Sequence, residues 1–402
     1  MISKKMKEYV TGSSLIRAMF EDSQKLASIY GAENVYDFSL GNPCFPPAGA
    51  LKNAMIEILN MEDQCAVHGY MNNAGHEAVR QSIADSLNRR FGTEFSARNI
   101  IMTVGAAGGI NVALKTLIDP GDEIIVFSPY FGEYDSYASN VSARLVEVQC
   151  RREDFMPDID GLRQALTPRT KAVILNSPNN PTGVVYSEDI IRAIAGALRE
   201  KQTEFGTAIY LFSDEPYREL VYGDVQVPYV TRYYENTIVG YSYSKSLSLA
   251  GERIGYLVIP EEAESSSDII AAAAVANRIL GFVNAPSLMQ LAVGACVDVE
   301  MDLKHYEDNR NILYHGLSEI GYDCIKPEGA FYLFFKSPID DDLEFAEKAK
   351  EFRLVIVPGT AFHCPGYIRL AYCTSEETIG AALPQFKKLW DAVRHEEDTA
   401  DA

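Results

Sequence analysis

Hydrophobic residues recur along the chain in two patterns, one typical of helices and the other of buried strands. Residues 15–29 carry apolar side chains at positions 15, 16, 19, 20, 26 and 29, a spacing that predicts an amphipathic helix. Between about residues 99 and 259, short apolar runs end in polar or turn-forming residues: NIIMTVGA, DEIIVFSPY, KAVILNSPNNPTG, AIYLFSDEPY and NTIVGYSYSK. Helical patterns such as INVALKTLID and SEDIIRAIAGALREK lie between several of these runs, so strands and helices alternate.

The apolar runs predict a mainly parallel sheet with helices on both faces, which is an α/β fold of three layers. Near-continuous apolar strands are typical of such sheets, because both faces of each strand are covered. Ligands of these folds bind outside the carboxyl ends of the strands. The polar residues that end the five runs are therefore the candidates for a functional site.

The last third of the chain has a different pattern. A long helical stretch over roughly residues 286–318 precedes three strand-like runs, GAFYLFFK, RLVIVPG and YIRLAYC, with turns and helical patches between them. The Gly- and Pro-rich segment 37–50 is a further candidate boundary. The 402 residues thus predict a large domain over residues 48–285 and a smaller α+β domain built from residues 1–47 and 286–402.

Composition and charge narrow the functional classes. The formal net charge is −20 and the isoelectric point is near 4.8, so we expect no nucleic-acid partner and no anionic membrane partner. A small anionic substrate then needs a local cationic pocket. The seven cysteines form no CxxC pair, which favours reduced thiols in the cytoplasm and no bound metal. The N-terminus lacks the apolar core of a secretory signal, and the most apolar window, DIIAAAAVANRILGFV, is too short and interrupted to span a bilayer.

The first three strand ends carry signals that ordinary turn chemistry also explains. In TVGAAGGINVALK, a strand runs into Gly105 and small residues open a helix, which is either an anion site or a tight strand–helix turn. SPYFGEY offers aromatic side chains that would cover a flat ring, although single aromatic residues are more often part of the core. NSPNNPTG combines polar amides with turn-forming residues.

The last two strand ends carry ionisable side chains. Asp214 ends an apolar run and Tyr217 follows closely, so Asp214 is either a helix cap or a buried carboxylate that pairs with a cationic ring nitrogen. Lys245 lies among small residues with no acidic residue before Glu252, and Arg253 follows. A lone lysine usually lies at the surface, but at a strand end without an acidic partner its pKa would fall and its amine would become nucleophilic.

Taken together, the strand ends provide an anion cradle, a ring-covering aromatic, an amide, a carboxylate with a phenol, an amine and an arginine. This set suits pyridoxal 5′-phosphate, which has a flat ring, a phosphate, a phenolic oxygen, a basic nitrogen and an aldehyde. The chain resembles the class I/II aminotransferases, pyridoxal-phosphate enzymes of fold type I that include aspartate aminotransferase. The resemblance runs from YDFSLGNP to YIRLAYCTS and rests on the blocks NNPTG, DEPY, SYSKSLSLAGERIG, PEGAFY and VPGTAF.

The resemblance implies catalytic roles for three residues, Lys245, Asp214 and Tyr217. Lys245 would link covalently to the cofactor aldehyde and move the substrate proton. Asp214 would keep the pyridine nitrogen protonated, which makes the ring an electron sink. Tyr217 and Asn180 would bond the phenolic oxygen of the ring.

The resemblance also implies which residues would hold the ring and the phosphate. Phe131 would stack on the ring, with Tyr130 and Tyr134 as its close neighbours in sequence. The phosphate would be held by backbone N–H groups, hydroxyls and a guanidinium from Gly105, Ala106, Ala107, Ser242, Ser244 and Arg253. Many relatives carry a hydroxyl residue at the position of Ala107, so this chain has one hydrogen bond fewer or supplies it from elsewhere.

Substrate binding and assembly are implied by further matches. Arg369, in GYIRLAY, would bind the α-carboxylate of the substrate, and the backbone of Gly41 would lie beside that carboxylate. Tyr70, in HGYMNNAG, matches a tyrosine that reaches the cofactor phosphate of the neighbouring subunit, which implies a homodimer with shared active sites. The segment between VPGTAF and YIRL is short and contains His363 and Cys364.

The resemblance implies transfer of an amino group from an L-amino acid to a 2-oxo acid by a ping-pong mechanism in amino acid metabolism. A carbon–sulfur β-lyase on the same scaffold would use the same residues and stays open. A non-enzymatic sensor domain is disfavoured by the acidic charge and the lack of an appended DNA-binding unit, and a dehydrogenase by the lack of a GxGxxG motif after the first strand. The substrate is open between aspartate and an aromatic amino acid. Arg278 of a partner subunit is a candidate for a distal carboxylate, with a helix-surface arginine as the alternative.

Overall fold

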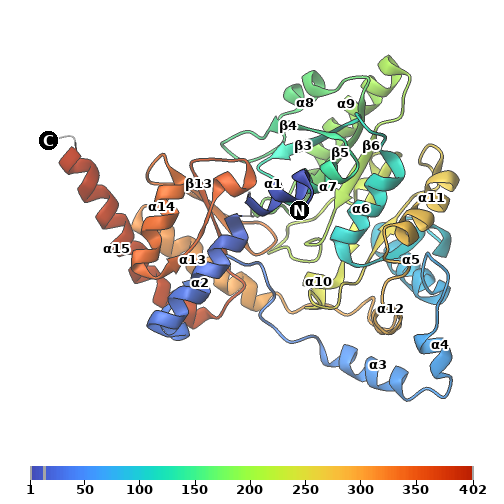
Figure 1. The fold of residues 1–402 in the computed structure, drawn as a ribbon, viewed down its shortest axis with the longest axis horizontal. Coiled ribbons are helices and arrows are strands. Elements are labelled where there is room, and N and C mark those ends of the chain that lie inside the picture. The colour runs from blue at the N-terminus through green and yellow to red at the C-terminus, as the bar shows by residue number, and fades with distance from the viewer. Residues whose placement is uncertain (1, 12–14, 401–402) are drawn as a thin grey trace.

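A seven-stranded sheet lies at the centre of the larger part of the protein (Figure 1). The structure is a computed structural model that describes residues 2–11 and 15–400. The strand order is β2-β8-β7-β6-β5-β3-β4, and β8 alone runs antiparallel to its neighbours. The strands are β2 (Ile100–Thr103), β3 (Glu123–Ser128), β4 (Arg144–Gln149), β5 (Thr170–Asn176), β6 (Tyr210–Asp214), β7 (Thr237–Ser242) and β8 (Gly255–Val258).

Helices cover both faces of this sheet because its inner strands are apolar on both sides. Ile124 and Val126 of β3 pack into a core with α6 (Gly105–Leu117) and α11 (Ser266–Ile279). The alternate residues of the same strand, Ile125 and Phe127, pack with α8 (Ile159–Ala165) and α9 (Glu188–Phe205). On β2 and β7, a further core is shared with α3 (Gly49–Leu59), α5 (Glu77–Phe91) and α12 (Ser287–Gly294). Burial of these apolar side chains is the main driving force for the layered fold.

A second sheet is built from the C-terminal part of the chain. Four strands pair antiparallel in the order β12-β13-β10-β9, and their bounds are β9 (Cys324–Ile325), β10 (Tyr332–Lys336), β12 (Val357–Pro358) and β13 (Tyr367–Ala371). Around it lie α13 (Lys304–Ile320), α14 (Asp342–Ala349) and α15 (Glu376–Ala400). The N-terminal α2 (Leu15–Tyr30) packs beside β11 (Leu354–Val355), which pairs in parallel with β1 (Tyr36–Asp37). The N-terminal α2 and the C-terminal α15 therefore both lie in this part of the molecule (Figure 1).

Most predicted elements are present. The five apolar runs form β2, β3, β5, β6 and β7, and the helical stripe at residues 15–29 lies within α2. β4 was not predicted, because this edge strand leaves most of its side chains partly exposed and so has no apolar run. The predicted helix over 286–318 is wrong in its middle, where residues 295–303 connect α12 to α13. From Val297 to Leu303, apolar and polar residues alternate with a period of two, which does not suit a helix.

The boundary between the two predicted domains stays a prediction at residue 286. Beyond it, Met289 and Val293 of α12 pack with Leu51 of α3 and Val79 of α5, which belong to the larger predicted domain.

The remaining helices are α1 (Lys4–Thr11), α4 (Gln64–His68), α7 (Glu133–Asn140) and α10 (Tyr243–Ser246). Within the described ranges, no helix combines the length and apolar character needed to cross a membrane, and no group of three His, Cys, Asp or Glu side chains is arranged to hold a metal ion.

Candidate active site

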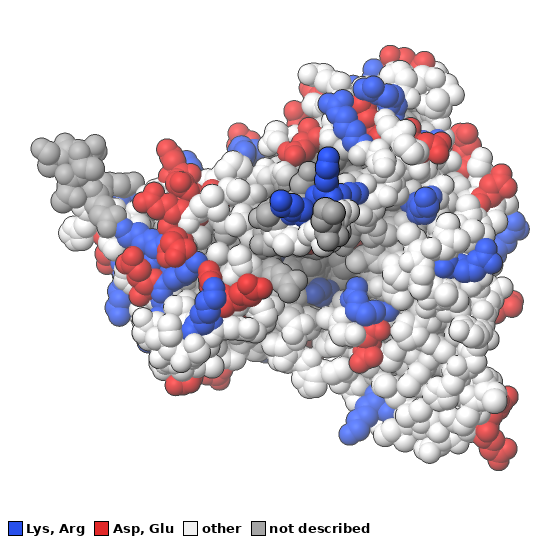
Figure 2. Space-filling view, in the orientation of Figure 1, with Lys and Arg blue, Asp and Glu red and all other residues white. Residues whose placement is uncertain are grey.

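A pocket of about 290 Å³ opens where β5, β6 and β7 end, at the edge of the sheet where the sequence predicts a ligand. The predicted site residues that line it are Gly41, Ala106, Ala107, Phe131, Asn180, Asp214, Tyr217, Ser242, Ser244, Lys245, Arg253 and Arg369. On the face shown in Figure 2, the surface is hollowed near the position of α10 in Figure 1, with Lys and Arg side chains at the edge of the hollow. The tertiary structure thus brings together residues from both sheets and from the N-terminal segment.

Asp214 is the last residue of β6 and, among the described residues that line the pocket, the only carboxylate. Its Oδ2 accepts a hydrogen bond of 2.6 Å from the Tyr134 hydroxyl, while its Oδ1 is buried without a partner. Burial raises the pKa of Asp214 to about 7; the hydrogen bond from Tyr134 acts against this, and the charge of Glu215 adds to it. A cationic N–H donor bound in the pocket would satisfy Oδ1 and lower this pKa again.

Lys245 faces the same pocket from α10. Its Nζ donates a hydrogen bond of 2.6 Å to the Gly41 carbonyl. Burial lowers the pKa of Lys245 to about 8; the cationic Arg253 and Arg369 lower it further, and Cys373 acts in the opposite direction. Because its pKa is close to neutrality, a useful fraction of the amine is uncharged and nucleophilic at mildly alkaline pH.

The groups that the sequence predicts to form an anion cradle lie together beside Arg253. Ser242 is the N-cap of α10, and its Oγ lies 2.7 Å from the Ser244 hydroxyl and accepts the Ser244 N–H. α6 begins at Gly105, where φ is 76° and an added Cβ would lie 2.7 Å from Arg253 Nη2. Glycine therefore allows the guanidinium to approach the helix N-terminus. Two hydroxyls, a guanidinium and exposed helix N–H groups are the donors that a phosphate dianion needs.

The aromatic wall of the pocket comes from α7 and the loop before it. Phe131 and Tyr134 line the pocket, and their rings meet edge to face with centroids 5.8 Å apart. Tyr130 is buried away from the pocket lining and stacks on His363. Phe131 and Tyr134 thus both line the pocket, Tyr134 bonds Asp214, and the stacking role of Phe131 stays a prediction.

Tyr217 and Asn180 lie on the side of the pocket towards the second sheet. The Tyr217 and Tyr332 hydroxyls are 2.8 Å apart, and burial raises the pKa of Tyr217 well above its ordinary value. Asn180 is held by its N–H, which donates to Asn176 Oδ1 at 2.8 Å, while its own Oδ1 accepts a 3.3 Å hydrogen bond from Arg369 Nη1. The two predicted partners of the phenolic oxygen are therefore both fixed at the pocket wall.

Arg369 lies on β13, buried between the rings of Tyr332 and Phe362 at 4.8 and 4.7 Å from their centroids. Its Nη2 donates to the Ser39 carbonyl, but its Nε has no partner. Burial lowers the pKa of Arg369. A buried guanidinium with an unused N–H is suited to bind a carboxylate. Gly41 is close by, and an added Cβ there would lie only 2.0 Å from the Tyr332 hydroxyl.

Gly105, the first residue of α6, is not among the described residues that line this pocket, and two further predicted residues lie outside it. Tyr70 is 96% exposed, and Arg278 lies near the end of α11 with an exposed side chain. Neither is among the described residues that line the pocket. Their proposed roles towards a neighbouring subunit stay predictions.

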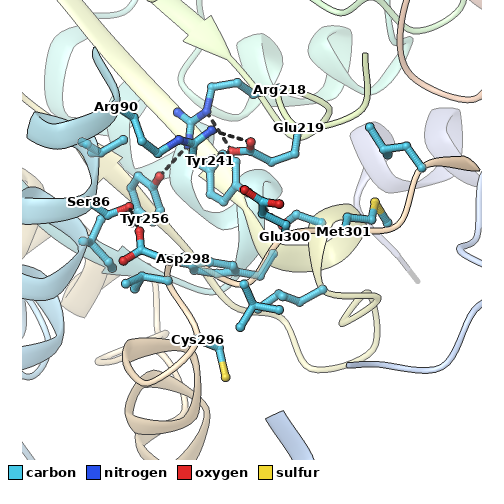
Figure 3. A pocket seen from close by; sticks show the side chains of 18 residues that line it. Ser86, Arg90, Arg218, Glu219, Tyr241, Tyr256, Cys296, Asp298, Glu300 and Met301 are labelled. Atoms are coloured by element: carbon cyan, nitrogen blue, oxygen red, sulfur yellow. Dashed lines mark hydrogen bonds and ion pairs between the residues drawn. The ribbon is translucent and has the colours of Figure 1, made fainter. Parts of the chain in front are cut away.

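A larger cavity of about 440 Å³ lies beside α10, between α5, β7, β8 and the 295–303 connection (Figure 3). Its arginines already have partners. Arg218 bonds to Glu215, Glu219 and Tyr256 at 3.0, 3.2 and 2.9 Å, and Arg90 pairs with Glu219. None of the residues that the sequence singled out lines this cavity. The smaller pocket, with its unpartnered carboxylate oxygen and guanidinium N–H, is the better candidate for chemistry.

Several lining residues were not singled out from the sequence. Tyr332 lies within the PEGAFY block and Asn176 ends the β5 run, so local signals for both were present. Ile16 and Leu40 also line the pocket, but they reach it from N-terminal segments that no strand-end argument covers. Tyr134 was recognised as aromatic, and only the tertiary structure reveals its bond to Asp214.

The fold and the site together define a lysine-centred α/β enzyme of fold type I. Its mainly parallel sheet carries a lysine amine, a buried carboxylate, two serine hydroxyls and an arginine near the strand ends. The sequence profile of the family described as "Aminotransferase class I and II" matches residues 33–385. The chain therefore belongs to the class I and II aminotransferases and is a transaminase.

Relatives and solved structures agree with this assignment. The "Aspartate/prephenate aminotransferase" of Thermus thermophilus is 33% identical over 79% of this chain and 82% of its own length. The "Aspartate aminotransferase" of Thermotoga maritima is 29% identical over 96% of this chain and 98% of its own. A crystal structure of an aminotransferase from Eubacterium rectale has a TM-score of 0.94 at 44% identity and covers 98% of this chain and 99% of that one. These relatives do not favour the lyase or sensor alternatives.

Proposed function

We propose that this pocket holds pyridoxal 5′-phosphate and that the protein uses it to move an amino group from an L-amino acid to a 2-oxo acid. The observation that carries the proposal is the unpartnered Asp214 Oδ1, buried in the same pocket as Lys245, a lysine of lowered pKa. A buried acceptor without a partner is costly unless a bound group supplies the missing donor. The protonated ring nitrogen of the cofactor is such a donor.

The residues present fit the other parts of the cofactor. Phe131 would cover the ring, and Tyr217 and Asn180 would bond its phenolic oxygen. Gly105, Ala106, Ala107, Ser242, Ser244 and Arg253 would hold the phosphate, and Tyr70 of a second subunit would complete its binding. This assignment is supported by the pocket lining and by the cradle at the start of α6 and α10.

The proposed mechanism uses four side chains of this chain. The cofactor, when bound, supplies an aldehyde and an electron-withdrawing ring. Arg369 binds the substrate α-carboxylate through its free Nε–H and fixes the amino acid beside Lys245. Lys245 Nζ takes the α-proton of the substrate and later returns a proton. Asp214 would hold the ring nitrogen through its carboxylate, and Tyr217 would donate a hydrogen bond to the phenolic oxygen. The two half-reactions share one site, so we expect ping-pong kinetics.

For the substrate, we propose a dicarboxylic amino acid such as aspartate, in line with what the names of several relatives state for those proteins. Among the described residues, the cations that line the pocket are Lys245, Arg253 and Arg369, all with roles already proposed. A distal carboxylate therefore needs a cation from elsewhere, and Arg278 of a partner subunit is the candidate. If no such cation reaches the pocket, an aromatic or other apolar amino acid is the alternative.

A homodimer is part of the proposal, since Tyr70 and Arg278 act only across an interface. Exposed apolar side chains in and just after α3 and α11 are candidates for that interface, because contiguous apolar patches often mark interaction sites. They are Ile56, Leu59, Met61, Val275, Ile279 and Leu280. We further propose a cytoplasmic location in amino acid metabolism, supported by the unpaired cysteines, and no nucleic-acid or membrane partner, supported by the net charge of −20.

The experiment that tests the function is a half-reaction screen. Each amino acid is added to the cofactor-loaded protein, and loss of the visible cofactor absorbance and release of the 2-oxo acid are measured. The Lys245→Ala variant should lose turnover while its circular dichroism stays unchanged, and Lys115→Ala, which alters an exposed lysine of α6, should behave as wild type. Release of ammonia and pyruvate without amino transfer would assign the lyase reaction instead, and full turnover by Lys245→Ala would refute the site.

A further inference from the structure

His363 connects the second sheet to the aromatic wall of the pocket. It follows the short helical turn at Gly359–Phe362, between β12 and β13. Its Nε2 lies 2.8 Å from Asp135 Oδ2, and its Nδ1 lies 3.1 Å from Glu147 Oε1. The Nε2 contact is a hydrogen bond and the Nδ1 contact is at ion-pair distance. Ionised carboxylates only accept hydrogen bonds, so two of them facing the two ring nitrogens favour the doubly protonated imidazolium.

Tyr130 completes this cluster from the loop after β3. Its ring stacks on the His363 ring, with centroids 4.3 Å apart and planes at 14°. Its hydroxyl lies 3.2 Å from Asp135 Oδ1 and 3.1 Å from Glu147 Oε1. The two carboxylates therefore bind the imidazolium and the phenol together. Arg152 and Asp342, the other charged groups beside this segment, contact its neighbours Cys364 and Thr360.

The main chain of the same segment is also tied to the large sheet. The Tyr130 N–H donates to the Phe362 carbonyl at 3.2 Å, and the Ser128 hydroxyl donates to the His363 carbonyl at 2.7 Å. His363 has a φ of 57°, a left-handed conformation that strains any residue with a Cβ. Glycine would remove that strain, so the side chain at this position points to a role for the imidazole itself.

Tyr130 connects this cluster to Tyr134 and Asp214 at the pocket. Tyr130 stacks nearly parallel to Tyr134, with centroids 6.2 Å apart, and Tyr134 donates to Asp214. Phe131 lies between them in sequence and lines the pocket. A shift of Tyr130 would therefore also displace Phe131 and Tyr134, and with Tyr134 the hydroxyl that donates to Asp214.

We propose that His363 is a positioning residue: it fastens the turn before β13 to Tyr130 and so holds the aromatic wall against the pocket. The same contact fixes Arg369, which follows on β13, relative to that wall. The contact needs the cationic imidazole. The effect on substrate binding rests on the function proposed above, whereas the effect on the turn itself does not.

The contact of His363 with Asp135 and Glu147 should weaken as the pH rises. The hydrogen bond to Asp135 and the charges of Asp135 and Glu147 raise the pKa of His363 above its ordinary value of 6.5, against desolvation. The contact is therefore complete below pH 6.5 and is lost as the pH rises through the raised pKa. Asp135→Asn removes one of the two charges and should shift this loss to lower pH.

The test uses hydrogen exchange in the cofactor-free protein, measured by mass spectrometry at pH 6.5 and pH 9 and corrected for intrinsic exchange. In wild type, peptides covering residues 128–137 and 359–366 should lose protection at the higher pH. His363→Gln and His363→Gly should lack that protection at both pH values. The control His315→Gln, which alters an exposed histidine of α13, should match wild type. If His363→Gly kept wild-type protection, the backbone and not the imidazole would hold the turn, and the proposal would be overturned.

A kinetic measurement separates positioning from folding. In the cofactor-loaded protein at pH 6.5, His363→Gln should raise KM for the amino acid about fivefold, the change expected for losing a partly exposed ion pair, with kcat nearly unchanged. An unchanged KM would overturn the positioning role. Absence of amino transfer in wild type would refute the proposed function, while the hydrogen-exchange result would stand on its own.

Discussion

The Asp214 carboxylate gives a prediction in which stability and activity change in opposite directions. Burial raises its pKa from an ordinary 3.8 to about 7, and this pKa difference of roughly three corresponds to about 4 kcal/mol at 1.36 kcal/mol per pKa unit. In the cofactor-free protein, ionised Asp214 therefore lowers the free energy of unfolding above pH 7. Asp214→Asn removes the charge and keeps the shape of the side chain.

The stabilisation of the cofactor-free protein by Asp214→Asn should increase as the pH rises. A carboxyl whose pKa is raised on folding contributes stability that is present below its unfolded pKa and is lost as pH rises through the folded value. Asp214→Asn should therefore stabilise the cofactor-free protein by about 2 kcal/mol at pH 5.5 and about 4 kcal/mol at pH 8. Urea unfolding followed by circular dichroism measures both. In contrast, kcat of the loaded enzyme should fall by at least ~100-fold, because the ring nitrogen loses its anionic partner.

A matched control is another buried aspartate whose oxygens are satisfied. Asp342 accepts hydrogen bonds from the Thr360 N–H at 2.7 Å and hydroxyl at 2.9 Å. Asp342→Asn should destabilise the protein by about 1–3 kcal/mol, since it disturbs those bonds. A lower urea midpoint for Asp214→Asn at pH 8, or an equal gain at both pH values, would refute the reasoning about Asp214.

Two further substitutions test the substrate side of the pocket. Gly41→Ala places a Cβ 2.0 Å from the Tyr332 hydroxyl, so Tyr332 must move. KM for the amino acid should rise about tenfold, which lies within the ~1–3 kcal/mol cost of an overpacked site. The control is Gly49→Ala, where an added Cβ meets no atom within 4 Å. Arg278→Ala should raise KM for aspartate about tenfold and leave that for an apolar amino acid unchanged, as expected when a charged contact is lost. An unchanged aspartate KM would rule out the proposed role of Arg278.

Much of the fold was predictable because the large sheet is built from local signals. Its inner strands are continuous apolar runs, and each run ends at the residue where the strand ends, as with Asp214. Parallel strands bring their carboxyl ends to one edge, so the order of the runs alone places Asp214 and Lys245 on the same side. β4 and the 295–303 connection were missed, because edge exposure and a short alternating pattern give no such signal.

What the sequence by itself determined is the chemistry: which residue types stand at the strand ends, and that a lysine, an aspartate and an arginine lie in blocks typical of one family. What only the tertiary structure decided is which atoms are left unpaired. Tyr134 bonds the other oxygen of Asp214, and Asn180 and Ser39 bond the other two nitrogens of Arg369. Only Asp214 Oδ1 and Arg369 Nε of these two side chains are left without partners. Such contacts depend on how distant segments pack, and no local pattern specifies them. The position of His363 between two carboxylates arose in the same way, from the docking of one sheet against the other.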